Sequence, residues 1–138
     1  MTSRLQLALN VSNLAEAIAF YSKMFSTPPA KVREGYANFA IADPPLKLVL
    51  IETPQVVGEH YQRINHLGVE MGSSGEVEEA ISHFAELGLV DSVEKESTCC
   101  FAVQDKVWVH DPDGAKWEYY TVLAAAESMS ENLTQNCC

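Results

Sequence analysis

The stretch "QLALNVSNLAEAIAFY" (residues 6–21) predicts the fold, because its pattern occurs twice in the chain. Its first part alternates between apolar and polar residues, as a half-buried strand does, and its second part has apolar residues at helical spacing. The same succession returns in "HLGVEM" (66–71) and in a helical segment whose "EAISHF" (79–84) echoes the "EAIAFY" of the first stretch. Gln6 and His66 hold equivalent places, 60 residues apart. The sequence therefore predicts an internal duplication.

Capping signals mark one helix in each copy. Asn13 is a predicted N-cap for the first helix, and Ser73 with Glu76 forms a capping box for the second, which ends near Gly88. Further strands are predicted at 36–43, 46–53, 100–111 and 115–123, with the "DPDG" turn (111–114) between the last two. The predicted fold class is α+β, with two βαβββ modules at about 4–53 and 64–123 in one domain (1–123), followed by a C-terminal tail (124–138).

Composition limits the classes of partner. The 138 residues carry a formal charge of −10, which disfavours binding to nucleic acids or to anionic membranes. No apolar run is long enough to span a bilayer, and the N-terminal segment lacks a signal-peptide pattern. We expect a cytoplasmic, reducing location and therefore cysteines that are free thiols or ligands. The oligomeric state stays open between monomer and homodimer.

Three polar residues stand inside apolar strands, namely Gln6, His66 and Glu118. Alternation places the neighbouring leucines on the helix-covered face, so these polar side chains face the opposite, concave side of the sheet. An imidazole, a carboxylate and an amide oxygen suit Fe(II), Mn(II), Ni(II) or Zn(II). The alternative is structural, because a lone strand histidine is often hydrogen-bonded and Glu118 can face solvent. The other histidines, at 60, 83 and 110, have no matched partner and are expected to be surface or structural residues.

The repeat, the "DPDGAKWEYYTV" segment and these three strand positions resemble the vicinal oxygen chelate superfamily, over roughly residues 4–123. The resemblance implies a cup-shaped mixed sheet with helices outside and a metal inside the cup. It also implies that a fourth ligand position falls near Val49, which is apolar, so a three-ligand site is favoured.

A narrower resemblance is carried by "QLALNV", "AIAFYSKMF", "NHLGVE" and "TCCFAVQDKVWVHDPDGAKWE". These segments are similar to the organoarsenical carbon–arsenic lyases, Fe(II)-dependent dioxygenases that act on trivalent methylarsenicals, a group also related to cadmium-induced proteins. The resemblance implies that Gln6, His66 and Glu118 hold Fe(II) and that Cys99 and Cys100 hold the arsenic. The implied substrates are a trivalent organoarsenical and dioxygen, and the implied product is inorganic arsenite.

Physical chemistry agrees with a chelating role for Cys99 and Cys100. Their Cα atoms are about 3.8 Å apart, which disfavours a mutual disulfide, because disulfides prefer about 4.4–6.8 Å. Two thiolates suit a soft trivalent arsenic centre with two exchangeable positions. We predict that the pair lies on a mobile loop at the start of a strand. The alternative is that the cysteines are small buried apolar residues.

Three further residues are weaker candidates. Lys106 is a tentative catalytic residue that closes over the substrate or steadies a developing anion, and the alternative is a solvated lysine. Cys137 and Cys138 are candidates for substrate capture, and the alternative is that they have no specific role. Two other functions remain open: a protein that sequesters cadmium or arsenic without catalysis, and a different superfamily enzyme such as a glyoxalase or a fosfomycin-modifying transferase.

Overall fold

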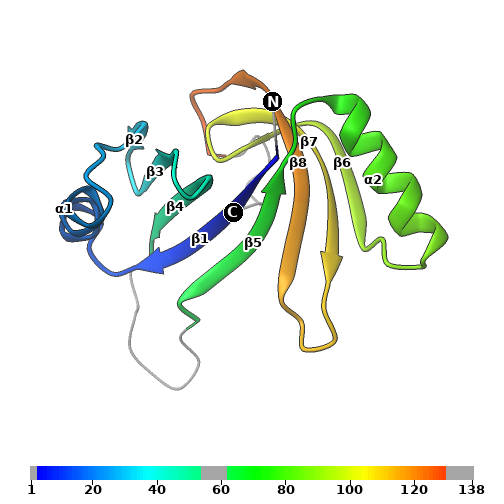
Figure 1. The fold of residues 1–138 in the computed structure, drawn as a ribbon, viewed down its shortest axis with the longest axis horizontal. Coiled ribbons are helices and arrows are strands. Elements are labelled where there is room, and N and C mark those ends of the chain that lie inside the picture. The colour runs from blue at the N-terminus through cyan, green and yellow to red at the C-terminus, as the bar shows by residue number, and fades with distance from the viewer. Residues whose placement is uncertain (1–2, 54–61, 130–138) are drawn as a thin grey trace. The chain divides into compact units, whose positions relative to one another are not determined.

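The computed structural model describes residues 3–53 and 62–129, and the polypeptide divides into two compact units. The first unit, Leu5–His66, is here named the first module; the second module is the described chain from Leu67 onward together with Arg4. The elements in chain order are β1 (Arg4–Val11), α1 (Leu14–Met24), β2 (Lys31–Arg33), β3 (Tyr36–Ile41), β4 (Leu46–Glu52), β5 (Ile64–Glu70), α2 (Ser74–Glu86), β6 (Ser92–Cys99), β7 (Ala102–His110) and β8 (Lys116–Ala125) (Figure 1). The predicted βαβββ order therefore occurs twice. None of the helices in the described ranges is long and apolar enough to cross a membrane.

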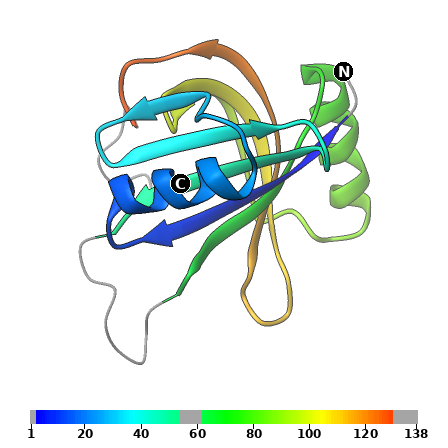
Figure 2. The same ribbon diagram turned by 60° about the vertical axis from the view of Figure 1, so that its left-hand side comes forward.

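The first module buries one face of its strands beneath α1. Its strands lie in the order β2-β3-β4-β1, with β1 parallel to β4 and β3 antiparallel to β4. Figure 2 shows α1 lying across these strands. The buried core residues are Leu14, Ala37, Phe39, Ile41, Leu48 and Leu50. Leu7 and Leu9 of β1 pack against this core, as the alternation predicts, whereas Leu5 is 47% exposed.

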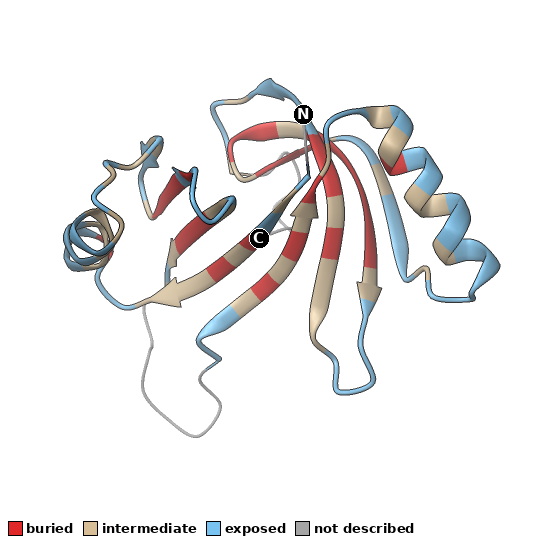
Figure 3. Ribbon diagram, in the orientation of Figure 1, coloured by how far each residue is buried: buried red, intermediate tan, exposed pale blue. Residues whose placement is uncertain are grey.

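The second module, which β5 enters at Leu67, repeats the arrangement with strands in the order β5-β8-β7-β6. β5 runs parallel to β8, while β7 pairs antiparallel with both β8 and β6. The buried positions recur along β7 and β8 in Figure 3, and α2 contacts both of these strands. The predicted turn at 111–114 is present, because the Asp111 carboxylate accepts hydrogen bonds from the backbone N–H groups of Asp113 and Ala115, each at 2.9 Å.

The predicted helix caps are confirmed. The Asn13 side chain accepts a hydrogen bond from the Glu16 N–H at 3.0 Å, and the Ser73 hydroxyl accepts one from the Glu76 N–H at 3.3 Å. Each cap satisfies a backbone donor that the first helical turn leaves without an intrahelical partner. Gly88 follows the end of α2 with φ +71°, a left-handed conformation that glycine adopts without a Cβ clash.

The segment before the paired cysteines differs from the prediction. We expected a polar loop that leads into a strand at residue 100, but the polar segment is itself β6, and Cys99 is its last residue. The next strand, β7, begins at Ala102. β6 lies at the end of the strand order, and an edge strand can keep polar and charged residues that a central strand excludes. The pair therefore lies at a hairpin turn.

Strand β8 continues to Ala125, where it pairs with Ala102 of β7. The following residues stay close to the hairpin turn, because the Ala126 N–H donates to the Phe101 carbonyl at 2.9 Å. Most of the predicted tail, including Cys137 and Cys138, lies outside the described residues. The predicted connector at 54–63 also falls largely outside them.

Candidate functional site

Gln6 and His66 meet in the first module. Gln6 lies on β1 and His66 near the start of β5, and both are buried, with exposed fractions of 3% and 2%. Their Nε2 atoms lie 3.1 Å apart. Gln6 takes this place because the alternating residues Leu7 and Leu9 of β1 turn toward the core beneath α1. Two of the three predicted ligand side chains are therefore in contact.

The His66 ring has a second polar neighbour that the sequence reasoning missed. His66 Nδ1 lies 2.9 Å from the side-chain oxygen of Asn65. In many metalloproteins one ring nitrogen of a histidine donates to such an acceptor, and the other ring nitrogen binds the metal. The signal was present in the sequence, since Asn65 is the residue directly before His66.

Glu118 and Lys106 meet in the second module. Lys106 on β7 donates from Nζ to a carboxylate oxygen of Glu118 on β8 at 2.8 Å. The Lys106 side chain is 0% exposed, so the alternative of a solvated lysine is wrong. Its ammonium group lies 5.5 Å from the centre of the Trp108 ring and 5.8 Å from that of Tyr120. Two aromatic faces and one carboxylate together compensate for the charge that the lysine buries.

Strand register identifies the residue of the first module that corresponds to Glu118. In the second module Gly68 of β5 pairs with Glu118 of β8, and in the first module Ala8 of β1 pairs with Val49 of β4. Val49 thus takes the place of Glu118, and it is buried and apolar. Strand β1 thus carries Gln6 in the place that His66 has on β5, whereas β4 carries no carboxylate in the place that Glu118 has on β8. Val49 therefore offers no fourth ligand, and the predicted donor set stays at Gln6, His66 and Glu118.

The structure brings Gln6 to His66 within one module and Lys106 to Glu118 within the other. The grouping of Gln6, His66 and Glu118 around one ion stays a prediction. Among the residues of ranges 3–53 and 62–129, no cluster of three or more His, Cys, Asp or Glu side chains is arranged to hold a metal. The predicted metal ligands do not form such a cluster, because one of the three, Gln6, is an amide.

The paired cysteines lie where β6 meets a two-residue hairpin turn, because Cys99 is the last residue of β6 and Cys100 is the first residue of the turn. Cys100 and Phe101 occupy its central positions with φ of +49° and +61°. Positive φ at both positions is typical of a type I′ turn, which usually contains glycine or asparagine. The turn is held by a hydrogen bond from the Cys100 N–H to the Met129 carbonyl at 2.8 Å. Phe101 is a bulky residue in the left-handed region, and its backbone is therefore strained.

Both cysteines of this turn are disulfide-bonded in the structure, so the prediction of free thiols is wrong for this state of the protein. Cys99 is also completely buried. Only a thiolate is a nucleophile or a ligand for a soft metal or arsenic centre. Binding of such a centre by Cys99 and Cys100 therefore requires reduction first.

Gln104 lies beside the cysteine turn and was also missed by the sequence reasoning. Its amide nitrogen donates to the Cys99 carbonyl at 2.8 Å. Its amide oxygen is buried and has no hydrogen-bond partner among the described residues. Such an acceptor is costly to bury unless something donates to it. No sequence signal distinguished this glutamine from its neighbours in β7.

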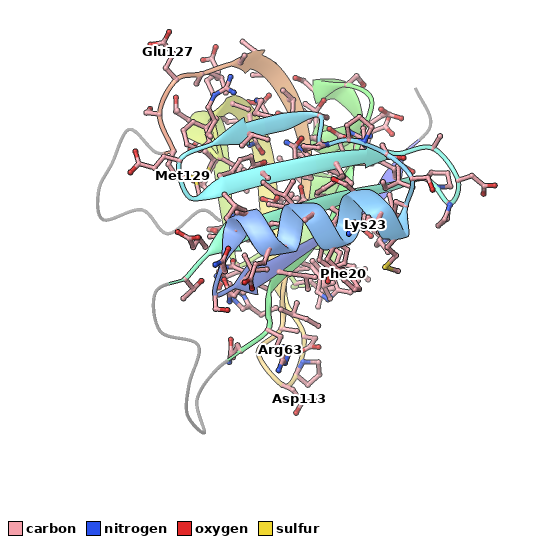
Figure 4. All side chains as sticks on the ribbon, turned by 90° about the vertical axis from the view of Figure 1, so that its left-hand side faces the viewer. Phe20, Lys23, Arg63, Asp113, Glu127 and Met129 are labelled. Carbon is pink, nitrogen blue, oxygen red and sulfur yellow. The ribbon has the colours of Figure 1, made fainter. Side chains whose placement is uncertain are left out.

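An open groove of about 480 Å³ lies in the first module beside the N-terminal half of α1. Its lining includes Asn10, Glu16 and Tyr21, together with Phe20 and Arg63, which are among the residues labelled in Figure 4. Neither Gln6 nor His66 lines this groove. The groove is therefore distinct from the buried donor pair.

Comparison with known proteins identifies the family. Residues 4–119 match the sequence profile of the Glyoxalase/Bleomycin resistance protein/Dioxygenase superfamily. The chain belongs to this superfamily. The superfamily match confirms the predicted glyoxalase-like, vicinal oxygen chelate fold.

Two of the curated relatives illustrate the similarity. The "Cadmium-induced protein CadI" of Mycobacterium tuberculosis (strain ATCC 25618 / H37Rv) is 56% identical over 134 residues, which cover 97% of this chain and 86% of that protein. The "Trivalent organoarsenical cleaving enzyme" of Thermomonospora curvata is 52% identical over 136 residues, which cover 99% of this chain and 88% of that protein.

Solved structures agree on the fold. The Mn(II)-bound glyoxalase from Novosphingobium aromaticivorans has a TM-score of 0.63 at 16% identity, with 92% of this chain and 42% of that chain covered. Homoprotocatechuate 2,3-dioxygenase from Arthrobacter globiformis has a TM-score of 0.61 at 20% identity, with 91% and 38% covered. At these identities the likeness shows the fold alone.

Proposed function

We propose that the protein cleaves the carbon–arsenic bond of trivalent organoarsenicals such as methylarsenite, in a reaction that needs Fe(II) and dioxygen and releases inorganic arsenite. The observation that carries the proposal is the 52% identity, over 99% of the chain, to a protein named trivalent organoarsenical cleaving enzyme. The adjacent cysteines at the β6–β7 turn support it, because a dithiol fits a monosubstituted trivalent arsenic.

The metal is assigned to Gln6, His66 and Glu118. The residues fit a divalent ion of intermediate hardness, since they offer one imidazole nitrogen, one amide oxygen and one carboxylate. All three side chains are buried, and two of them are already in contact at 3.1 Å. Rotation of the Gln6 amide would present its oxygen in place of its nitrogen. Fe(II) bound there would supply the redox chemistry that dioxygen needs to react with an organic group.

The substrate is assigned to the reduced forms of Cys99 and Cys100. Each thiol displaces one hydroxide of methylarsenite as water, so two arsenic–sulfur bonds form and two waters leave. The methyl–arsenic bond is not used in this exchange and stays available for cleavage. Holding the arsenic in this way converts a bimolecular encounter into a step within one complex.

Lys106 is assigned a positioning role through Glu118. Its ammonium group holds one carboxylate oxygen at 2.8 Å and fixes the side chain in a buried place. In this proposal the other oxygen of Glu118 is the one that binds the metal. Lys106 also compensates for the negative charge of that carboxylate when no cation is bound.

The overall reaction balances without an added reductant. Methylarsenite and one dioxygen contain the same atoms as arsenite and one formaldehyde. The methyl carbon loses four electrons, dioxygen accepts four, and arsenic stays trivalent. The expected organic product of methylarsenite is therefore a carbon at the formaldehyde level.

A second candidate function is sequestration of cadmium or arsenic without catalysis. The observation that favours it is the 56% identity to a protein named cadmium-induced, which is the higher of the two identities. The two functions differ in stoichiometry, since sequestration takes up one ion or molecule for each site and releases nothing.

The deciding experiment uses the reduced full-length protein with Fe(II) and methylarsenite, with and without dioxygen, and measures arsenite by chromatography with elemental mass detection. We expect many turnovers with dioxygen and none without it. The Glu118→Ala variant should lose release, whereas His110→Gln, which changes a partly exposed histidine beside Asp91, should keep it. Stoichiometric binding without arsenite release would support sequestration and contradict the proposal.

A further inference from the structure

A chain of side-chain amides links a backbone carbonyl at the protein surface to the ring of His66. The Asn10 amide nitrogen donates to the Gln62 backbone carbonyl at 2.8 Å. The Asn65 amide nitrogen donates to the Asn10 side-chain oxygen at 3.0 Å. The Asn65 side-chain oxygen lies 2.9 Å from His66 Nδ1. All four residues belong to the first module.

The direction of every hydrogen bond in this relay follows from its first member. A backbone carbonyl can only accept, so the Asn10 group that faces it must be the NH₂. The Asn10 oxygen then faces Asn65, which must present its own NH₂. The Asn65 oxygen is therefore turned to His66, and a carbonyl oxygen can only accept. The proton of this last bond must be carried by His66 Nδ1.

Two further contacts hold Asn10 in this orientation. The Thr53 hydroxyl donates to the Asn10 side-chain oxygen at 3.1 Å. The Asn10 backbone N–H donates to the Arg63 carbonyl at 2.7 Å. A turned Asn10 amide would place its oxygen against the Gln62 carbonyl oxygen and its NH₂ against the NH₂ of Asn65.

We propose that Asn10 and Asn65 form a polarised relay that holds His66 in the Nδ1–H tautomer and so keeps its Nε2 lone pair ready for a metal ion. The Gln6 contact is consistent with this, because Gln6 Nε2 lies 3.1 Å from His66 Nε2 and an amide NH₂ needs an acceptor there. Asn65 is thus a positioning residue, and its metal-related role rests on the proposed function.

The tautomer is measured directly by ¹⁵N NMR of the histidine rings in the metal-free full-length protein, at about pH 8.5, where an ordinary imidazole is neutral. The His66→Gln variant assigns the His66 signals by their loss. We expect a protonated Nδ1 and an unprotonated Nε2 in the unsubstituted protein. Asn65→Ala removes the acceptor and should let the ring exchange between both tautomers. Asn65→Asp keeps an oxygen at Nδ1 and should retain the Nδ1–H form.

The matched control is Asn13→Ala. It removes an asparagine side chain from the same module and thereby breaks the N-cap of α1. This variant should destabilise α1 without changing the His66 tautomer. The control separates loss of the relay from general destabilisation.

Metal affinity provides the second readout, with Co(II) as the probe and its visible absorption as the signal. We expect Asn65→Ala to weaken Co(II) binding by about 10–100-fold, the usual effect of removing a group that orients a metal ligand. Asn65→Asp should stay within about threefold of the unsubstituted protein, because it still orients the ring.

An Nε2–H tautomer in the unsubstituted protein would overturn the proposal, as would an Asn65→Ala variant whose tautomer is unchanged. If Co(II) does not bind the unsubstituted protein, the proposed metal site fails, but the ring signals still decide the relay. Failure of the relay and failure of the proposed function therefore give different results.

Discussion

Replacement of Lys106 by methionine tests the buried ion pair of the second module. Methionine keeps most of the side-chain volume but removes the ammonium group that holds Glu118 at 2.8 Å. At an effective dielectric constant of about 20, the attraction between two charges at this distance is about 6 kcal/mol. Desolvation of the two buried ions offsets much of this gain, so the net value of the pair is smaller.

Removing only one partner destabilises the protein by more than the pair as a whole stabilises it, because the other charge stays buried. The Glu118 carboxylate stays buried, with its side chain 4% exposed, but loses its counter-ion. We therefore expect Lys106→Met to lower the free energy of unfolding by about 3–5 kcal/mol. For a chain of this size the loss corresponds to a melting temperature lower by about 10–20 °C. Replacement of both residues, in Lys106→Met/Glu118→Leu, should recover most of the loss because no buried charge remains.

The assay is urea unfolding of the metal-free protein, followed by circular dichroism and extrapolated to water. The matched control is Lys95→Met, since Lys95 pairs with Glu78 at the surface, with exposed fractions of 41% and 58%. This control should change stability by less than about 1 kcal/mol. A Lys106→Met loss as small as that of Lys95→Met would refute the reasoning, as would a double variant that is less stable than the single one.

Three further outcomes are expected. Phe101→Gly should be more stable than Phe101→Ala by about 1 kcal/mol in urea unfolding. Both variants lose the buried ring, but only glycine accepts a φ of +61° without strain. The reverse order of stability would contradict the turn geometry. Mass spectrometry should detect one methylarsenic group on Cys99 and Cys100 after reduction and none before it, and equal uptake in both states would contradict the assignment of these thiols. Ser73→Ala should cost about 1 kcal/mol of stability through loss of the α2 cap, whereas the exposed Ser92→Ala should cost less than half of that; equal effects would argue against the cap.

The sequence predicted the regular elements well because their signals are local. Alternation in β1 separates Leu7 from Gln6 by one residue, and the two faces of the strand then differ in environment. Asn13 and Ser73 mark helix starts because capping acts within a single turn. β6 was missed for the opposite reason, since its polar residues are tolerated only because it lies at the edge of a sheet.

The environment of Lys106 was not predictable from its neighbours in sequence. It lies in "QDKVWV", where a charged residue next to Asp105 has the pattern of a solvated strand face. Its carboxylate partner is 12 residues further along the chain, on the next strand. Pairing across strands therefore decides whether this ammonium group is solvated or buried.

The sequence by itself determined the duplicated βαβββ order, the capped helices and the polar positions at Gln6, His66 and Glu118, because periodicity and capping depend on residues close together in the chain. Only the tertiary structure decided which groups those polar side chains contact. Asn10 and Asn65 are 55 residues apart, yet their hydrogen bond sets the direction of the relay to His66. The direction of hydrogen bonds depends on which donor meets which acceptor in space, and a linear pattern of residue types does not contain that information.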